Sequence, residues 1–259
     1  MAEMVSGMEI LTDSSLLQKY NVDDLPVYLN KESLFDYPEK RVTSHWNDGL
    51  EIVNVLDGCM NITVNGVEYE ARQSDVIVIF PGYVHYFENI EGNNCSYYCG
   101  VFHEVLLSNA DSIVKRYINP MFHSFHPGVI VFHKESEYYK PIKEVFSRIG
   151  VLLNEKKFAY ELRLSACLHE FLALLCDSVE QSFFLYTAAD KTSYDAIRNM
   201  ITYVQENYGR VVSVEELCEA GHVSRNQCFN VFQKYTGCTP SNYVMKFRLH
   251  MAKGMLATT

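Results

Sequence analysis

A series of short segments rich in β-branched and aromatic residues, between Pro26 and Glu135, restricts the fold of this chain most strongly. Turn residues separate the segments, and each is shorter than a typical helix. Short strands at even spacing are typical of an antiparallel sandwich or barrel. The clearest segments are LEIVNVLDG (50–58), MNITVNGVEYEA (60–71), DVIVIF (75–80) and CSYYCGVFHEVLL (95–107).

Asn65 and Gly66 give the strongest local signal in this region. Alternating apolar residues flank the pair on both sides. Asn and Gly tolerate positive φ, which a two-residue type I′ turn requires at both of its central positions. The sequence therefore predicts a tight hairpin at Asn65 and Gly66.

The apolar period changes after Tyr138, where two amphipathic helices are predicted up to residue 179. The second helix is apolar over more than half of its circumference, so it must cover the sheet, a second subunit, or both. We expect residues 136–182 to contribute to a homodimer, and residues 183–192 to form a linker. The wide apolar face comprises Leu164, Leu168, Phe171, Leu172 and Leu175.

The charge of the chain is distributed unevenly. The formal net charge is −10. Residues 1–191 hold 27 acidic and 15 basic residues, whereas residues 192–259 hold 5 acidic and 7 basic ones. This acidity argues against wholesale coating of nucleic acid, yet the last quarter is a separate electrostatic unit. There is no signal-like start and no apolar run of about 18 residues, so we expect a cytoplasmic protein without a membrane partner.

Two short helices joined by a glycine-containing turn are predicted after residue 210. Ser213, followed three residues later by Glu216, forms the capping-box pattern that begins helices. Gly221 marks the turn, and a second helix is expected from Ser224 to Tyr235. Together with a preceding helix over residues 193–208, this is the helix-turn-helix arrangement.

The second helix of this pair presents amides and cations on its outer face. Asn and Gln can pair with adenine, and Arg and Lys can bind guanine or phosphate. A polar helix face is more often only solvated, and the concentration of amides in the first two turns is what favours DNA. The residues expected to contact DNA are Ser213, Ser224, Arg225, Asn226, Gln227, Asn230 and Lys234.

The stretch TGCTPSNYVMKFRLHMAKGMLATT (236–259) closely resembles the DNA-binding domain of the AraC family of transcription regulators. In that family the corresponding stretch ends the first helix-turn-helix and forms a long linker helix. The resemblance implies double-stranded operator DNA and RNA polymerase as partners. The matching positions are Thr236, Gly237, Thr239, Pro240, Tyr243, Arg248, Ala252, Leu256 and Thr258. Base contact would fall to Asn226, Asn230 and Phe229, and backbone contact to Ser213, Arg225 and Gln227.

One departure from the family pattern lies at the end of the chain. Family members carry a second helix-turn-helix after the linker helix, and the sequence stops at Thr259 where it would begin. We therefore expect residues 193–259 to be a truncated DNA-binding domain. Its operator binding should be weak, because fewer phosphate contacts release fewer counterions.

The stretches RVTSHWNDGLEI (41–52) and FPGYVHYFEN (80–89) resemble the two motifs of cupin barrels. The resemblance implies that residues 1–135 form a jelly-roll-like effector domain, as in one large AraC subgroup. Asn47 stands where cupins carry a second histidine, and Ser74 replaces a common glycine. The matching positions are His45, Glu51 and Gly58 in the first motif, and Pro81, Gly82, His85 and Asn89 in the second.

His45, Glu51 and His85 admit three interpretations. Two histidines and one carboxylate suit Fe(II) or another divalent ion, which would indicate a metal-dependent isomerase or dioxygenase. Asn47 weakens this interpretation, since an amide oxygen is a poor ligand beside imidazole. A second interpretation is purely structural, with the imidazoles bonded to backbone. We favour the third, a pocket for a small molecule, without catalysis, metal or cofactor.

The ligand expected in this pocket is a sugar or a similar small polar metabolite, since aromatic faces and hydrogen-bonding groups suit hydroxyl-bearing molecules. Strand alternation predicts that Asn47 faces inward if His45 does, and that Trp46 then faces outward or to the rim. The expected ligand-binding residues are His45, Trp46, Asn47, Glu51, Tyr83, His85 and Tyr86. The sequence thus predicts an α+β protein: an antiparallel barrel, then helices and a helix-turn-helix domain, acting as a ligand-responsive, sequence-specific transcription regulator.

Overall fold

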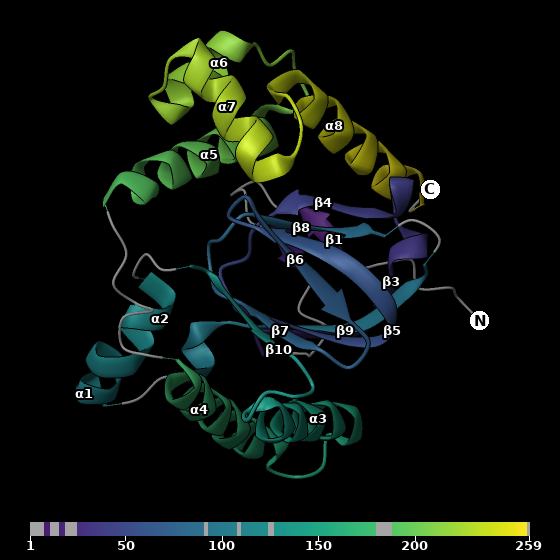
Figure 1. Cartoon of the computed structure of the whole chain (residues 1–259), viewed down its shortest axis with the longest axis vertical. Helices are drawn as coiled ribbons and strands as arrows, with labels where there is room; N and C mark the ends of the chain where they lie inside the picture. Colours follow the sequence, from purple (N-terminus) through teal and green to yellow (C-terminus); the bar gives the residue numbers. More distant parts are fainter. Residues whose placement is uncertain are drawn as a thin grey trace.

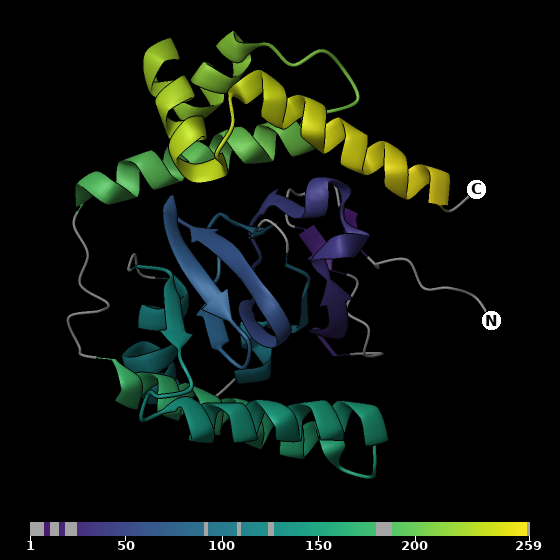
Figure 2. The same cartoon turned by 45° about the vertical axis from the view of Figure 1, so that its right-hand side comes forward.

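The computed structural model describes residues 8–10, 16–18, 25–90, 93–107, 110–123, 127–179 and 188–257. The molecule is layered (Figures 1 and 2). On one side lie helices α3 (Tyr139–Glu155) and α4 (Tyr160–Ser178), and antiparallel strands fill the middle. On the other side lie α5 (Ala188–Asn207), α6 (Val214–Gly221), α7 (Arg225–Thr236) and α8 (Pro240–Ala257).

The middle layer consists of two antiparallel sheets joined by one long strand. The strands are β3 (Val27–Ser33), β4 (Arg41–His45), β5 (Leu50–Val64), β6 (Val67–Arg72), β7 (Val76–Ile79), β8 (His85–Asn89), β9 (Cys95–Phe102) and β10 (Val129–Phe132). One sheet has the order β10-β7-β5-β9-β3 and is covered by α3 and α4. The other has the order β6-β5-β8-β4 and faces α5 to α8.

The predicted barrel does not close. Among the described strands, β10 and β3 are the edges of one sheet, β6 and β4 are the edges of the other, and no pairing joins these edges. The two sheets share only β5, which passes from one to the other near Gly58. Gly58 has φ +78°, and a Cβ there would lie 1.6 Å from the carbonyl oxygen of Asn94, so the crossing requires glycine. Helices, not further strand pairs, cover the outer faces.

The hairpin at Asn65 and Gly66 is confirmed. Val64 pairs with Val67, so the loop has two residues, with φ +52° at Asn65 and +76° at Gly66. The strands expected from residue 50 to 80 are present, but the expected strand 95–107 ends at Phe102 because a 3₁₀ helix, η3 (Glu104–Leu107), follows.

Several short elements had no signal of their own in the sequence. A two-stranded hairpin, β1 (Met8–Ile10) with β2 (Leu16–Gln18), precedes the sheets. The 3₁₀ turns η1 (Leu34–Asp36) and η2 (Pro38–Lys40) lead into β4. Between η3 and β10 the chain forms α1 (Asp111–Ile113), the π-helix η4 (Val114–Ile118) and α2 (Asn119–His123).

The wide apolar face of α4 is buried inside the chain. All five residues of that face are less than 7% exposed and belong to one hydrophobic core with α3 and the sheets. Of the two partners considered for this face, the sheets of the same chain are therefore the ones it covers. Helix α5 begins at Ala188, earlier than the expected residue 193, because alanine favours helix; residues 183–187 of the expected linker lie outside the described residues. Within the described residues, no helix is both long and apolar enough to span a bilayer.

Candidate functional site

Three ionisable side chains meet between the sheets, at the end of β4 and the starts of β5 and β8. His45 and His85 are register partners, with ring centroids 4.2 Å apart. Possible ligand atoms of His45, Glu51 and His85 all lie within 4.8 Å of one another. None of the three residues is more than 3% exposed. The two cupin-like motifs thus converge on a single buried cluster.

Both imidazoles of this cluster are oriented by backbone. Nδ1 of His45 donates to the carbonyl of Thr43 at 2.8 Å, and Nδ1 of His85 donates to the carbonyl of Tyr83 at 2.7 Å. A carbonyl oxygen only accepts, so Nδ1 carries the hydrogen in each ring and Nε2 is left for the cluster. Nε2 of His85 lies 2.9 Å from Oε2 of Glu51, although the geometry does not make a standard hydrogen bond.

Glu51 is the anion of the cluster. Asn47 donates its amide hydrogen to Oε2 at 2.5 Å, and the thiol of Cys99 contacts Oε1 at 3.3 Å. Burial acts to raise the pKa of Glu51, but His85 and His45 outweigh it and the pKa is lowered. The arrangement can accept a polar or cationic ligand, because it combines a carboxylate, an amide and two imidazole nitrogens.

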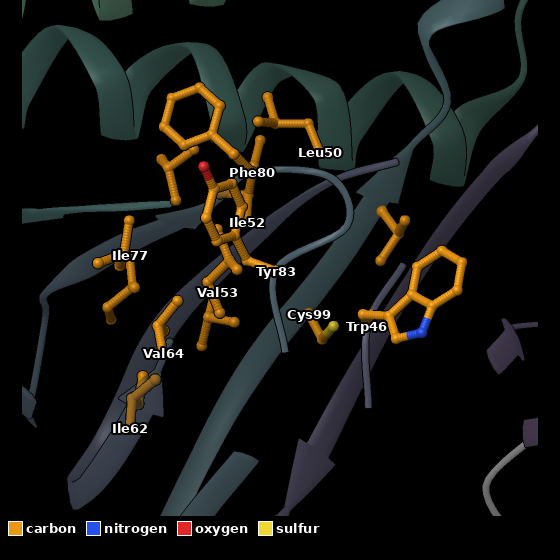
Figure 3. Close-up of a cluster of buried hydrophobic side chains, with 14 of the residues drawn as sticks. Trp46, Leu50, Ile52, Val53, Ile62, Val64, Ile77, Phe80, Tyr83 and Cys99 are labelled. Atoms are coloured by element: carbon orange, nitrogen blue, oxygen red, sulfur yellow. The ribbon is translucent and has the colours of Figure 1, made fainter. Parts of the chain in front are cut away.

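The aromatic residues expected at the ligand lie elsewhere. The ring of Trp46 is under the guanidinium of Arg198, 4.5 Å from its centroid. Tyr83 packs against Tyr194 of α5, with centroids 5.0 Å apart. The ring of Tyr86 lies under Arg41 at 4.0 Å. Figure 3 shows Trp46 set apart from the aliphatic side chains of β5 and β7.

The structure therefore divides the seven expected ligand-binding residues into two groups. It brings His45, Asn47, Glu51 and His85 together, and it directs Trp46, Tyr83 and Tyr86 toward other partners. The alternation of His45, Trp46 and Asn47 agrees with the expectation for extended chain.

Two sets of polar contacts in the interior were not predicted from the sequence. Cys99 reaches Glu51 because β9 pairs with β5, a register that the sequence does not show. Glu32 accepts hydrogen bonds from the hydroxyls of Tyr28, Tyr37 and Tyr97 at 2.6, 2.7 and 3.1 Å. Burial raises the pKa of Glu32 despite these bonds. The signal that could have indicated this cluster is the spacing of Tyr28 and Glu32, four residues apart and therefore on the same face of β3.

The residues that the sequence predicts to contact DNA lie on α6 and α7, on the side of the sheets away from α3 and α4. The predicted capping box of Ser213 with Glu216 begins α6, and a second capping box, Ser224 with Gln227, begins α7. Arg225 pairs with Glu215 of α6 and also lies over the ring of Phe229. The exposed residues of α7 are Arg225, Asn226, Gln227, Asn230, Gln233 and Lys234, whereas Ser213 is half-buried.

The described chain is built around two antiparallel sheets that share β5, with helices packed on both sides of them. The family described as AraC-like ligand binding domain matches residues 34–172, which is more than half of the chain. The protein belongs to this family.

Known relatives are transcriptional regulators. The chain is 24% identical over 235 residues to the HTH-type transcriptional regulator YdeC of Bacillus subtilis (strain 168), covering 90% of this chain and 79% of YdeC. It is 21% identical over 217 residues to the HTH-type transcriptional regulator YbfI of the same organism, covering 84% and 74%. Among solved structures, ToxT from Vibrio cholerae O395 is similar, with 13% identity, a TM-score of 0.44, and coverage of 88% of this chain and 82% of ToxT.

Proposed function

We propose that this protein is a ligand-responsive transcriptional regulator that binds specific DNA sequences. The observation that carries the proposal is the presence, on one chain of the AraC-like family, of a buried polar cluster and an exposed amide-rich helix. The cluster is the effector site, and α6 with α7 is the helix-turn-helix.

The effector proposed for the cluster is a sugar or a similar small polar metabolite. Hydroxyl groups can donate to Glu51 and to imidazole Nε2, and the amide of Asn47 can donate and accept. This proposal rests on the polar groups alone, because Trp46, Tyr83 and Tyr86 contact other side chains. A thermal-shift screen of monosaccharides and oligosaccharides tests it, with Glu51→Gln as the variant that should lose any response.

The DNA surface proposed is the exposed side of α7. Asn226 and Asn230 would contact bases, and Arg225 and Lys234 would contact phosphate or guanine. Ser213, Ser224 and Gln227 are already engaged in the capping boxes, so their contribution would be backbone contact at helix starts. Fluorescence anisotropy with the promoter DNA of the protein's own gene, at stated salt, tests this assignment. Equal affinity for random duplex would contradict it.

The homodimer surface proposed is the tip of the α3 and α4 pair. Since the wide face of α4 is used within the chain, self-association falls to the exposed apolar residues Val151, Phe158 and Leu162, which are 55%, 97% and 75% exposed. A dimer would allow two half-sites to be read at once. RNA polymerase is the further partner proposed for the DNA-bound protein.

A metal-dependent enzyme is the second candidate, and the orientation of the imidazoles favours it. Two Nε2 atoms and a carboxylate converge, and backbone carbonyls fix both rings as is usual for metal-binding histidines. The residues therefore fit a divalent ion, which would supply Lewis-acid chemistry, with His45, Glu51 and His85 as its holders. Elemental analysis of protein purified without added metal distinguishes the candidates: near-stoichiometric iron, manganese or zinc, absent in a His45→Ala/His85→Ala variant, would favour the enzyme.

A further inference from the structure

An uncharged row of side chains runs along α7, in the helical unit formed by α5 to α8 (Figure 1). The row comprises Asn226, Phe229, Asn230 and Gln233. These residues lie three, four and seven positions after the first of them, a spacing that places them on one face of a helix. The three amides of the row are exposed, and its aromatic ring is half-buried. The row is therefore accessible to a partner outside the helical unit.

Two cations border this row on opposite sides. Arg225, the first residue of α7, pairs with Glu215 of α6, and its guanidinium carbon lies 5.8 Å from the ring centroid of Phe229. Lys234 lies in the last turn, with its ammonium 4.8 Å from the ring centroid of Tyr235. At about 3.6 residues per turn, the two cations fall on either side of the row. Neutral groups between two cations match a DNA groove, in which base edges lie between two phosphate backbones.

The row itself contains no arginine or lysine. These are the side chains that recognise guanine most often, through hydrogen bonds to its O6 and N7 atoms. Arg225 would have to leave both Glu215 and the ring of Phe229 to reach a base edge. Its position at the border of the row favours a phosphate instead.

The amides of the row match adenine. An asparagine can donate from Nδ2 to adenine N7 while its Oδ1 accepts a hydrogen bond from the N6 amino group. Against guanine, Oδ1 would face the O6 acceptor, and one of the two hydrogen bonds would be lost. Among the described residues, none forms a hydrogen bond with the side-chain amide of Asn226 or Asn230. Both amides are therefore available to a base.

The aromatic ring of the row matches thymine. In the major groove thymine presents a C5 methyl group and the O4 acceptor, whereas cytosine presents an amino donor and no methyl group. Phe229 can pack on the methyl group, but it offers no acceptor to the cytosine amino group. Along α7 the ring of Phe229 lies between the amides of Asn226 and Asn230. The row thus presents groups for adenine and for thymine side by side.

We infer that α7 recognises a short run of A·T base pairs through the major groove. Asn226 and Asn230 contact adenines, Phe229 contacts a thymine methyl group, and Arg225 and Lys234 contact the flanking phosphates. From Asn226 to Gln233 the helix rises about 10 Å, which at about 3.4 Å per base pair corresponds to about three pairs. The inference rests on the proposed function, that α7 contacts DNA, and it names the bases that this helix selects.

The experiment changes the methyl group and the major-groove pattern separately. The full chain selects duplexes from a random pool, and the enriched duplex is synthesised with substituted bases for fluorescence anisotropy at one stated salt concentration. Deoxyuridine in place of thymidine removes only the methyl group, and it should weaken binding about fourfold for each methyl group in contact. Inosine·cytosine in place of A·T adds no minor-groove amino group but presents the guanine pattern in the major groove. It should weaken binding about ten- to hundredfold for each pair that an asparagine contacts.

Phe229→Ala assigns the methyl contact to its side chain. This variant should bind the thymidine and deoxyuridine duplexes equally, whereas Asn230→Ala should retain the preference for thymidine. Leu249→Ala is the matched control, because it removes an exposed apolar side chain from α8, and it should also retain that preference. Circular dichroism verifies that each variant is folded. Loss of the preference in Leu249→Ala as well, or its persistence in Phe229→Ala, would overturn the assignment of Phe229.

Glu215→Gln tests whether Arg225 contacts phosphate. Release of Arg225 should strengthen binding to the enriched duplex and to its G·C-substituted form by the same factor, about two- to fivefold beyond the effect of Glu219→Gln. Glu219→Gln removes the same charge from another exposed position of α6. A gain confined to the G·C-substituted duplex would assign Arg225 to guanine and overturn the inference.

The selection distinguishes failure of the inference from failure of the proposed function. An enriched duplex with a G·C core, or equal binding of its inosine·cytosine form by wild type, would overturn the inference and leave sequence-specific DNA binding intact. A pool without any enriched sequence would overturn the proposed function, and the inference with it.

Discussion

Nε2 of His85 lies 2.9 Å from Oε2 of Glu51, with both side chains at most 2% exposed. This contact joins the two cupin-like motifs, and it helps to lower the pKa of Glu51. Burial acts to raise the pKa of the Glu51 carboxyl, but its contacts with His85, His45 and Cys99 outweigh burial and lower the pKa.

Glu51 should make the fold sensitive to low pH. Its pKa is lowered in the folded chain, so the stability it contributes is present above the unfolded pKa of about 4.3 and is lost as pH falls through the folded pKa. In urea unfolding between pH 7 and pH 3, the difference in unfolding free energy between wild type and Glu51→Gln should shrink below about pH 4.3. The exposed carboxylate variant Glu68→Gln serves as control, and a constant difference for Glu51→Gln would contradict the prediction.

Glu32 should show the opposite dependence. Its pKa is raised by burial, so the folded state holds the proton more tightly, and the corresponding stability is lost as pH rises from about 4.3 through the folded pKa. Relative to Glu32→Gln, wild type should therefore become less stable with increasing pH in the same urea titrations. If the unfolding free energy of wild type relative to Glu32→Gln instead increases with pH, the hydrogen bonds from the three tyrosine hydroxyls lower the pKa of Glu32 by more than burial raises it.

Gly66→Ala should destabilise the protein at the hairpin turn. The residue has φ +76°, and an added Cβ would lie 2.6 Å from the carbonyl of Lys234, so backbone strain and a steric clash combine to cost about 1–3 kcal/mol. Gly209→Ala is the matched control, because a Cβ there meets nothing within 4 Å. Thermal and urea unfolding of the two variants would give the comparison; equal stabilities would refute the assigned turn geometry.

Asn230→Ala should reduce the preference for specific DNA over random duplex. Loss of one bidentate base contact costs about 1–3 kcal/mol on the specific site alone. Lys234→Ala should instead weaken both affinities and reduce the salt dependence, because a phosphate contact carries no sequence information. Asn242→Ala, an exposed asparagine on α8, is the control in the anisotropy assay. Equal losses of DNA affinity in all three variants would contradict the proposal that α7 contacts DNA.

Phe158→Ser and Leu162→Ser together should shift the protein toward monomer. Both side chains lie at the tip of the α3 and α4 pair and are more than 70% exposed, so their replacement leaves the core intact while it removes apolar contact area. Light scattering coupled to gel filtration measures the change. Val67→Ser, at an exposed position of β6, should have no effect, and an unchanged oligomeric state in the double variant would place the interface elsewhere.

Features that depend on a few neighbouring residues could be predicted from the sequence. The hairpin at Asn65 and Gly66 follows from backbone sterics, and the capping boxes at Ser213 and Ser224 follow from hydrogen bonds over three residues. The inward face of α4 follows from its period. The pairing of His45 with His85 was also accessible, because both positions fall in motifs whose arrangement is known from cupins.

The tertiary structure alone decided what the remaining side chains do. The crossing of β5 between two open sheets depends on long-range register, which leaves no periodic mark in the sequence. The aromatic ring of Trp46 is of the type that stacks on sugars. Its contact with Arg198 of α5, which is distant in sequence, shows that it packs against the helical unit instead. The sequence by itself determined the local elements, since their energies arise between near neighbours; the structure decided which polar groups share the site, since those contacts depend on how distant segments pack.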